Sequence, residues 1–211
     1  MEADRDPPED GPTLSIIVAT IGRPTLTRTL ASIASQLAPG DEVIVVRDAS
    51  GDPGDTARMD AMPRARGTRL AFMDDDDVYA PDGLAKMRRF ASEHPGRIAI
   101  FKMEHPVGTT HWRESEPELR YGNVSSQNFL VPNVPGRLGR WHELPRPSGK
   151  GNYAGDYVFI KETIELQGEP VFVDEVTARV RPIRNPLRLL WVRARYRAAL
   201  GTHIRRLRRN T

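Results

Sequence analysis

The sequence predicts an α/β fold in which a mostly parallel sheet is flanked by helices. Three short apolar runs, 14–19, 42–46 and 70–73, have the length and composition of buried strands. A segment with apolar residues at helical spacing, 26–37, separates the first two. A strand, a helix and a strand joined by short loops form a right-handed crossover, so these strands run parallel. Their carboxyl ends should therefore meet at one edge of the sheet, where open α/β sheets bind their ligands.

The remaining elements are predicted from turn residues and apolar spacing. Pro24 suits the first turn of the helix over 26–37, and Pro39 and Gly40 end it. A polar turn, 47–52, follows the second strand. Beyond the third strand we expect two more helices and three more strands: helices over 81–91 and 157–164, and strands over 97–103, 128–132 and 171–173.

The third strand ends in four consecutive aspartates, Asp74 to Asp77. Neighbouring carboxylates repel each other, so a site that holds them together usually contains a cation. In extended backbone, positions i and i+2 point to the same side, so Asp74 and Asp76 can bind one ion. Carboxylate oxygens with room for phosphate oxygens suit Mg²⁺ or Mn²⁺. We therefore expect a divalent-cation site at the carboxyl end of this strand.

The aspartates also allow two interpretations that do not involve such a site. Most runs of like charge form a solvated loop, but apolar residues flank this run on both sides. A calcium loop of the EF-hand kind would need an oxygen ligand and then a glycine where this chain has Val78 and Tyr79. The site for Mg²⁺ or Mn²⁺ agrees better with the sequence than either of these.

Polar residues after the first two strands should line the same crevice as the aspartates. Thr20 and Arg23 follow the first strand, and Asp48 follows the second. Asp48 can also be a simple turn residue, since aspartate is common in turns. Asp156 precedes the helix expected over 157–164, where an aspartate often serves as the N-cap. A capping aspartate can also be catalytic, so both roles stay open for Asp156.

Charge is divided unevenly along the chain. The 211 residues carry 31 basic and 28 acidic side chains, yet residues 176–211 hold 11 arginines and no acid. From residue 187 onward, apolar residues recur at helical spacing and most arginines lie off that stripe, which is typical of a basic amphipathic helix. Two interpretations stay open for this tail, 183–211: a helix packed on the body with solvated arginines, or a helix that binds an anionic membrane or another polyanion.

Composition limits the domain organisation and the compartment. The chain has no cysteine, which excludes disulfides and thiolate metal sites and fits a reducing compartment. No apolar stretch is long enough to span a bilayer. Residues 1–12 are acidic and proline-rich without the apolar core of a signal peptide, so we expect a disordered lead-in. We therefore expect one domain over 13–182, in a cytoplasmic protein that can also bind peripherally to the inner face of the membrane.

Four segments, in this order, resemble the family 2 glycosyltransferases: 15–24, 45–50, 72–77 and 155–157. The resemblance covers residues 13–180, and the first three segments are its more specific part. It implies the GT-A fold, a Rossmann-like sheet flanked by helices. It also implies inverting transfer of a sugar, such as a hexose, from a UDP-, GDP- or dTDP-sugar to an acceptor hydroxyl. The acceptor would be a glycan, a lipid-linked molecule or another compound, as in envelope or surface glycan synthesis.

The resemblance also implies roles for individual residues. It assigns nucleotide contacts to residues after the first two strands: Thr20, Ile21, Arg23 and Asp48. It makes Asp74 and Asp76 the DxD motif that holds Mn²⁺ or Mg²⁺ against the diphosphate. It gives Asp75 or Asp77 a contact with a ribose hydroxyl or with the residues that bind the metal. It makes Asp156 the general base. From charge and position alone, we add Arg179 or Arg181 as a contact for the diphosphate.

The chemistry of these residues agrees with that activity. A metal ion neutralises the charge that grows on a departing diphosphate, and a carboxylate on the opposite face accepts the proton of the attacking hydroxyl. The chain departs from the family pattern at Arg47, where the family has an acid, and at Gly155, where it has an acidic neighbour of the base. It also departs in the short, arginine-rich segment between Asp48 and the third strand.

The same features allow three alternatives, and the first is a non-catalytic protein with a degenerate transferase fold, which the departures from the family pattern leave open. The other two are different functions. A nucleotidyltransferase would also use acids to bind metal, but it usually has a phosphate loop rich in glycine and basic residues after the first strand, and residues 20–23 contain only one of each. A nucleic-acid- or polyanion-binding protein would use the arginine-rich tail. We do not expect nucleic acid as the partner, because the body is acidic and the arginines gather at one end. The sequence leaves the donor sugar, the acceptor and the formation of a homo-oligomer open.

Overall fold

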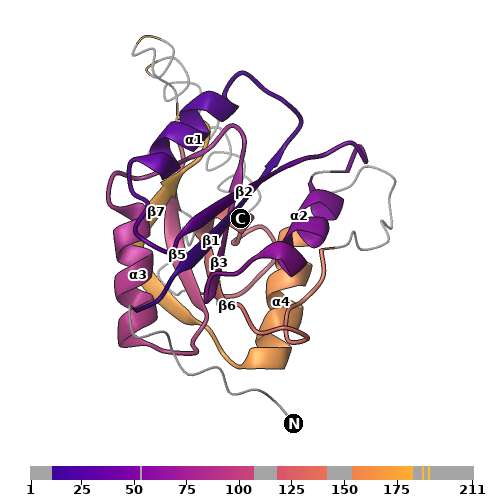
Figure 1. Cartoon of the computed structure of the whole chain (residues 1–211), viewed down its shortest axis with the longest axis vertical. Helices are drawn as coiled ribbons and strands as arrows, with labels where there is room; N and C mark the ends of the chain where they lie inside the picture. Colours follow the sequence, from indigo (N-terminus) through magenta and orange to yellow (C-terminus); the bar gives the residue numbers. More distant parts are fainter. Residues whose placement is uncertain are drawn as a thin grey trace, which may run out of the picture.

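The computed structural model describes residues 11–52, 54–106, 118–141 and 154–182, together with residues 187 and 190. These residues build a seven-stranded sheet covered by helices on both faces (Figure 1). The strands are β1 (Leu14–Thr20), β2 (Glu42–Arg47), β3 (Arg69–Asp74), β4 (Val78–Tyr79), β5 (Ala99–Glu104), β6 (Phe129–Pro132) and β7 (Val171–Arg179). Their order across the sheet is β2-β1-β3-β6-β5-β7-β4.

The sheet is mostly parallel, as the sequence predicts. The long pairings, β1 with β2, β1 with β3 and β5 with β7, are parallel. The antiparallel pairings of β6 with β3 and β5, and of β4 with β7, involve only two or three residue pairs each. Strand β6 is antiparallel to both of its neighbours, β3 and β5, so these two run in the same direction. The carboxyl ends of β1, β2, β3, β5 and β7 therefore point to one edge of the sheet. The predicted common edge is thereby confirmed.

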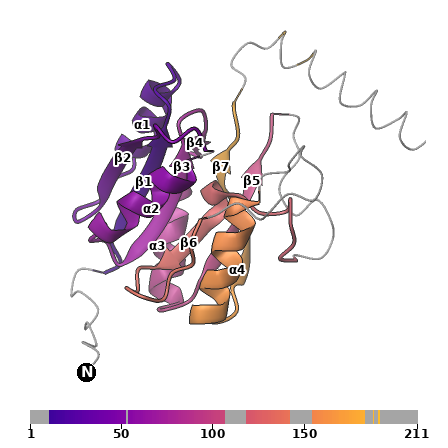
Figure 2. The same cartoon turned by 90° about the vertical axis from the view of Figure 1, so that its right-hand side faces the viewer.

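Within residues 11–182, as far as the structure describes them, two helices cover each face of the sheet. The helices are α1 (Leu26–Ala34), α2 (Asp55–Ala61), α3 (Gly83–Glu93) and α4 (Gly155–Gln167), and the 3₁₀ turns are η1 (Met62–Arg64) and η2 (Ser126–Asn128). Helices α1 and α3 pack on one face and α2 and α4 on the other, so that in Figure 2 α2 and α4 lie in front of the strands. Along β1, Ile16 and Val18 face the first pair and Ile17 the second, which is the alternation of a strand buried on both sides.

The structure differs from the expected elements in several places, among them the two-residue strand β4, which the sequence pattern does not predict. Helix α2 is absent from the sequence prediction because its seven residues are mostly polar. Its start is fixed by the Asp52 carboxylate, which accepts from the backbone N–H groups of the N-cap Gly54 and of Asp55, the first helical residue, at 2.8 Å each. Helix α1 ends at Ala34, well before Pro39, and is thus shorter than the expected 26–37. Strand β7 continues to Arg179, through a register shift against β5, whereas the apolar pattern predicts only 171–173.

Several expectations concern residues that lie wholly or largely outside the described part of the chain. These are the lead-in over 1–12, of which only residues 11 and 12 are described, and the basic helical tail over 183–211, of which only residues 187 and 190 are described. The domain boundaries therefore stay predictions. Among the residues that the structure describes, no helix combines the length and the apolar character needed to cross a bilayer.

Candidate functional site

A cleft of about 540 Å³ opens at the carboxyl edge of the sheet, beyond the ends of β1, β2 and β3. Most residues that the sequence singled out line it: Thr20, Ile21, Arg23, Asp48, Asp74, Asp75, Asp76 and Arg181. The parallel pairing of β1 with β2 and β3 explains this convergence, because their following loops leave the sheet side by side. A volume of this size suits a ligand larger than a single metabolite ring.

The four aspartates form a turn at the end of β3. The backbone N–H of Asp77 donates to the carbonyl of Asp74 over 3.3 Å. Asp74, Asp76 and Asp77 each offer a carboxylate oxygen, and these oxygens lie within 4.8 Å of one another. The expected reason for convergence, an extended strand through Asp76, is therefore wrong, because β3 ends at Asp74 and the turn brings the side chains together. The turn also adds Asp77 to the cluster.

Asp75 stands apart from this cluster and fixes the loop after β1. Its buried carboxylate accepts hydrogen bonds from the Thr20 hydroxyl (2.6 Å), the Ile21 N–H (3.1 Å) and the Arg23 guanidinium (2.6 Å). Burial raises the pKa of Asp75, but the bonds from Thr20 and Arg23 outweigh it and hold the pKa below its usual value. Asp75 is therefore ionised and holds one wall of the cleft in place.

Gln127 links two members of the aspartate cluster. Its side-chain N–H₂ donates to Asp74 over 2.7 Å and to Asp77 over 2.5 Å, and the other oxygen of Asp77 accepts from the backbone N–H of Arg181 (2.8 Å). Asp77 is almost fully buried, and burial together with the charge of Asp74 raises its pKa to about 7. Such crowding of carboxylates is relieved by a bound cation.

Arg58 of α2 is a site residue that the sequence pattern does not reveal. Its guanidinium is almost fully buried and forms an ion pair with Asp74, lies 3.8 Å from a carboxylate oxygen of Asp55, and sits 5.5 Å from the centre of the Trp141 ring. In the sequence, the sign of this role is weak: Arg58 lies between Ala57 and Ala61, which are buried positions of the short helix α2.

The two arginines expected to contact the diphosphate have different surroundings. Arg181 contacts the cluster, with its Nε 3.0 Å from an Asp76 oxygen. Its φ of 39° turns the chain out of strand geometry, and Arg28 holds this turn by donating to the carbonyls of Pro182 (3.2 Å) and Asp76 (2.9 Å). Arg179 is instead paired with Glu104 at 2.9 Å. The structure thus brings Arg181, and not Arg179, to the aspartates.

Asp156 lies in the first turn of α4 and does not cap the helix, whose N-cap is Ala154. Its carboxylate accepts hydrogen bonds from the indole N–H of Trp141 (3.2 Å) and the hydroxyl of Ser125 (3.3 Å). Asp156 is close enough to the cluster that its charge contributes to the raised pKa of Asp74, after the larger effect of burial. Of the two roles left open for Asp156, the N-cap is therefore excluded, and the carboxylate stands beside the aspartate cluster.

Asp48 ties the second loop to the first. Its backbone N–H donates to the carbonyl of Thr20 over 2.8 Å, and its carboxylate accepts from the Ser50 N–H (2.9 Å) and hydroxyl (2.5 Å). Asp48 is half-buried and lines the cleft, so its carboxylate is available to a ligand that enters there.

The donor set fits a hard divalent cation. Three carboxylates offer one oxygen each from a single turn, and Mg²⁺ and Mn²⁺ are commonly bound by a few carboxylates together with water and phosphate oxygens. The pKa of Asp77 is raised first by burial and then by the charge of Asp74, and a cation bound to the cluster would offset both effects. The residues present therefore suit the metal that the sequence predicts.

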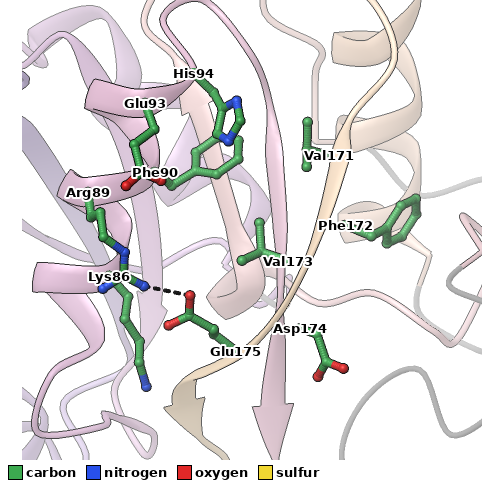
Figure 3. Close-up of a pocket in the computed structure, with 10 residues that line it drawn as sticks. All are labelled: Lys86, Arg89, Phe90, Glu93, His94, Val171, Phe172, Val173, Asp174 and Glu175. Carbon is green, nitrogen blue, oxygen red and sulfur yellow. Dashed lines mark hydrogen bonds and ion pairs between the residues drawn. The ribbon is translucent and has the colours of Figure 1, made fainter.

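A second, smaller hollow of about 240 Å³ lies between α3 and the first half of β7 (Figure 3). An ion pair of 2.5 Å between Arg89 and Glu175 stands at its wall, and Lys86 is paired with Asp82 at 3.0 Å. Its lining comes from α3 and from the amino-terminal half of β7, whereas the cleft is lined by Arg181, which follows the carboxyl end of that strand. Because these charges are paired within the protein, we assign the function to the cleft at the carboxyl edge.

Comparison with known families agrees with this geometry. Residues 53–142, which include α2, the aspartate turn, Gln127 and Trp141, match the model of the family described as glycosyl transferase family 2. This match confirms the resemblance to family 2 glycosyltransferases. No curated protein matches the chain in sequence.

Solved structures of the S. aureus protein TarS have the same fold as this chain. TarS 1–349 is 20% identical, with a TM-score of 0.60 over 80% of this chain and 60% of that one. The same fragment in complex with UDP-GlcNAc is 18% identical, with a TM-score of 0.55 over 82% of this chain and 59% of that one. The chain thus spans about three fifths of TarS 1–349. The likeness supports an α/β fold with a curled, mostly parallel sheet, consistent with GT-A.

Proposed function

We propose that the protein is a metal-dependent, inverting glycosyltransferase that moves a sugar from a nucleotide-diphosphate sugar to an acceptor hydroxyl. One observation carries this proposal: Asp74 and Asp76 line a cleft at the carboxyl edge of the sheet, their carboxylates converge with that of the buried Asp77, and a further carboxylate, Asp156, stands beside them. A sugar diphosphate needs both features, since its leaving group is anionic and its acceptor must lose a proton.

The donor would lie along the cleft from β2 to the aspartate turn. Thr20, Ile21, Arg23 and Asp48 border the end proposed for the nucleoside, where Asp75 holds the loop after β1. Arg181 adds a positive charge beside Asp76, at the end proposed for the diphosphate. TarS has been crystallised with UDP-GlcNAc and with UDP. We therefore propose a UDP-sugar ahead of a GDP- or dTDP-sugar as the donor.

Asp74, Asp76 and Asp77 would hold Mn²⁺ or Mg²⁺. When bound there, the cation supplies positive charge to the departing diphosphate. Gln127 and Arg58 keep the carboxylates of this turn in place through their contacts with Asp74. Arg181 adds charge from the protein itself, so the leaving diphosphate would be stabilised from two sides.

Asp156 would accept the proton of the acceptor hydroxyl while that oxygen attacks the anomeric carbon. Ser125 and Trp141 orient its carboxylate, which is half-buried in the first turn of α4. A single displacement from the face opposite the diphosphate inverts the configuration at the anomeric carbon, and no covalent intermediate with the protein is needed.

We also propose the setting that the sequence suggests. The protein would act in the cytoplasm, where the absence of cysteine fits a reducing environment. The arginine-rich tail, 183–211, would bring it to an anionic membrane surface, as suits a protein of envelope or surface glycan synthesis.

Donor turnover tests this proposal. Release of nucleoside diphosphate is measured from UDP-, GDP- and dTDP-sugars with a mixture of sugar acceptors, with and without Mn²⁺. We expect Mn²⁺-dependent release from one donor class, reduced at least about a hundredfold in Asp156→Asn. The control, Asp60→Asn, removes an exposed carboxylate of α2 and should leave the rate unchanged. Full activity of Asp156→Asn would remove Asp156 from the role of base.

A further inference from the structure

A pair of tyrosines stands beside the proposed base and has no role in the chemistry proposed so far. Tyr157 follows Asp156 directly in the first turn of α4. Tyr121 lies four residues before Ser125, whose hydroxyl is bonded to Asp156. The two rings meet edge to face, with centroids 6.4 Å apart and planes at 90°. Tyr121 is 42% exposed and Tyr157 is half-buried, so the pair borders the solvent next to the base.

The turn that carries Tyr121 is held in a defined shape. The buried Asn123 donates from its backbone to the carbonyl of Arg120 (3.0 Å) and from its side chain to the carbonyl of Glu118 (2.9 Å). Gly122 has a φ of +79°, a conformation that residues with a side chain rarely adopt. The position of Tyr121 is therefore set by its turn and by Tyr157.

The two side chains offer the chemistry that recognises a sugar ring. Within the described residues, neither the Tyr121 nor the Tyr157 hydroxyl has a hydrogen-bond partner, so both can bond to a ligand. The face of a phenol ring carries partial negative charge and attracts weakly positive C–H groups, while its hydroxyl donates and accepts hydrogen bonds. A pyranose presents C–H groups on its ring faces and hydroxyls around its edge.

We propose that Tyr121 and Tyr157 form the acceptor platform, and that the acceptor is a pyranose-containing glycan. This inference rests on the proposed function, because the acceptor hydroxyl is defined by its place beside Asp156. With a pyranose on the platform, one of its hydroxyls lies toward Asp156. That oxygen forms a bond to the anomeric carbon of the donor, the bond from this carbon to the diphosphate breaks, and the proton passes to the Asp156 carboxylate.

Saturation-transfer NMR on the full chain, with Mg²⁺ and UDP present, tests the platform. The probes are methyl β-glucopyranoside, methyl β-N-acetylglucosaminide and methyl α-mannopyranoside, with sorbitol as an open-chain polyol. After irradiation of aromatic protons, we expect the ring protons of at least one pyranoside to be saturated, and those of sorbitol not. Tyr121→Ala should lower the signal at least about fivefold, and Tyr121→Phe should retain most of it because the ring remains.

A second readout separates this inference from the proposed function. UDP binding in the presence of Mg²⁺, followed by thermal shift, should be equal in wild type and both variants, because neither tyrosine lines the cleft. Absence of UDP binding to the wild type would contradict the proposed donor site, whatever the sugars do. The platform is overturned if no pyranoside is saturated, if sorbitol matches the pyranosides, if Tyr121→Ala keeps the full signal, or if it loses UDP binding.

Discussion

The indole N–H of Trp141 donates a hydrogen bond of 3.2 Å to the carboxylate of Asp156. Trp141 is itself fixed by the core: its ring stacks on Phe159 at 3.6 Å and meets Phe72 edge-on at 4.6 Å. The packing between β3 and α4 thus sets the direction of the proposed base. Trp141, which packs as a core residue, therefore also positions the carboxylate of Asp156.

Trp141→Phe tests this positioning. The substitution keeps an aromatic ring against Phe159 and removes the donor to Asp156. We expect kcat to fall about fivefold, as for the loss of one hydrogen bond, with the KM for the donor unchanged. Steady-state kinetics of nucleotide release measures both constants, and thermal melting confirms that the variant is folded. An unchanged kcat, or a change confined to KM, would contradict the positioning role.

Asp77 makes the free energy of unfolding of the metal-free protein depend on pH, and its raised pKa determines the direction of this dependence. Its pKa is about 7 in the folded protein and 3.8 in its ordinary state, so between these values the folded state binds the proton that the unfolded state has lost. The free energy of unfolding therefore falls as pH rises from about 4 to 7, by at most about 1.4 kcal/mol per pH unit, and is constant above.

The comparison of wild type with Asp77→Asn isolates this contribution. Urea unfolding in EDTA at pH 5 and pH 8 should show that the variant gains stability relative to wild type at the higher pH. Groups with lowered pKa values, such as Asp52 and Asp75, act in the opposite direction but are shared by both proteins, so they cancel. A difference in stability that is independent of pH would show that Asp77 has an ordinary pKa.

Asp75→Asn should weaken nucleotide binding by releasing the loop after β1. The charge that holds Thr20, Ile21 and Arg23 is lost, so the loop after β1 no longer has a fixed shape. We expect the Kd for UDP to rise about tenfold, measured by titration calorimetry. The exposed Asp60→Asn serves as the control. Equal affinity in Asp75→Asn and the control would exclude the anchoring role.

Arg58→Met should destabilise the fold and make its stability depend on divalent cations. Removal of the buried guanidinium leaves the carboxylates of Asp74 and Asp55 without this partner, which we expect to cost about 3 kcal/mol. Mg²⁺ should restore part of this loss, because a cation at the cluster again balances Asp74. Urea unfolding with and without Mg²⁺ measures how much of the lost stability the ion restores. A variant that Mg²⁺ stabilises no more than it does the wild type would contradict the coupling.

The sequence predicts the parts of the site that depend on a single strand and its loop. The parallel strands β1, β2 and β3 contain apolar runs, so their common edge, and with it Thr20, Asp48 and Asp74, could be placed from pattern alone. Arg58 could not, because its role depends on how α2 packs against β3 and Trp141. A mostly polar helix of seven residues gives too weak a pattern for that packing to be foreseen.

Arg179 and Arg181 show a second limit of the sequence pattern. They are two positions apart, so in a continuing strand both would point to the same side. Strand β7 ends at Arg179, and the φ of 39° at Arg181 turns its side chain to Asp76 while Arg179 stays with Glu104. The alternation of side chains along a strand shows neither where β7 ends nor that Arg181 has a positive φ, so the different positions of the two arginines could not be predicted.

Titration calorimetry of UDP-GlcNAc into the full chain, with and without Mn²⁺, tests the central claim most directly. We expect binding to one site per chain that needs Mn²⁺, is lost in Asp76→Asn and is retained in Asp60→Asn. Binding that is equally tight without Mn²⁺, or equally tight in Asp76→Asn, would contradict the assignment of the aspartate turn to a metal ion and a sugar diphosphate.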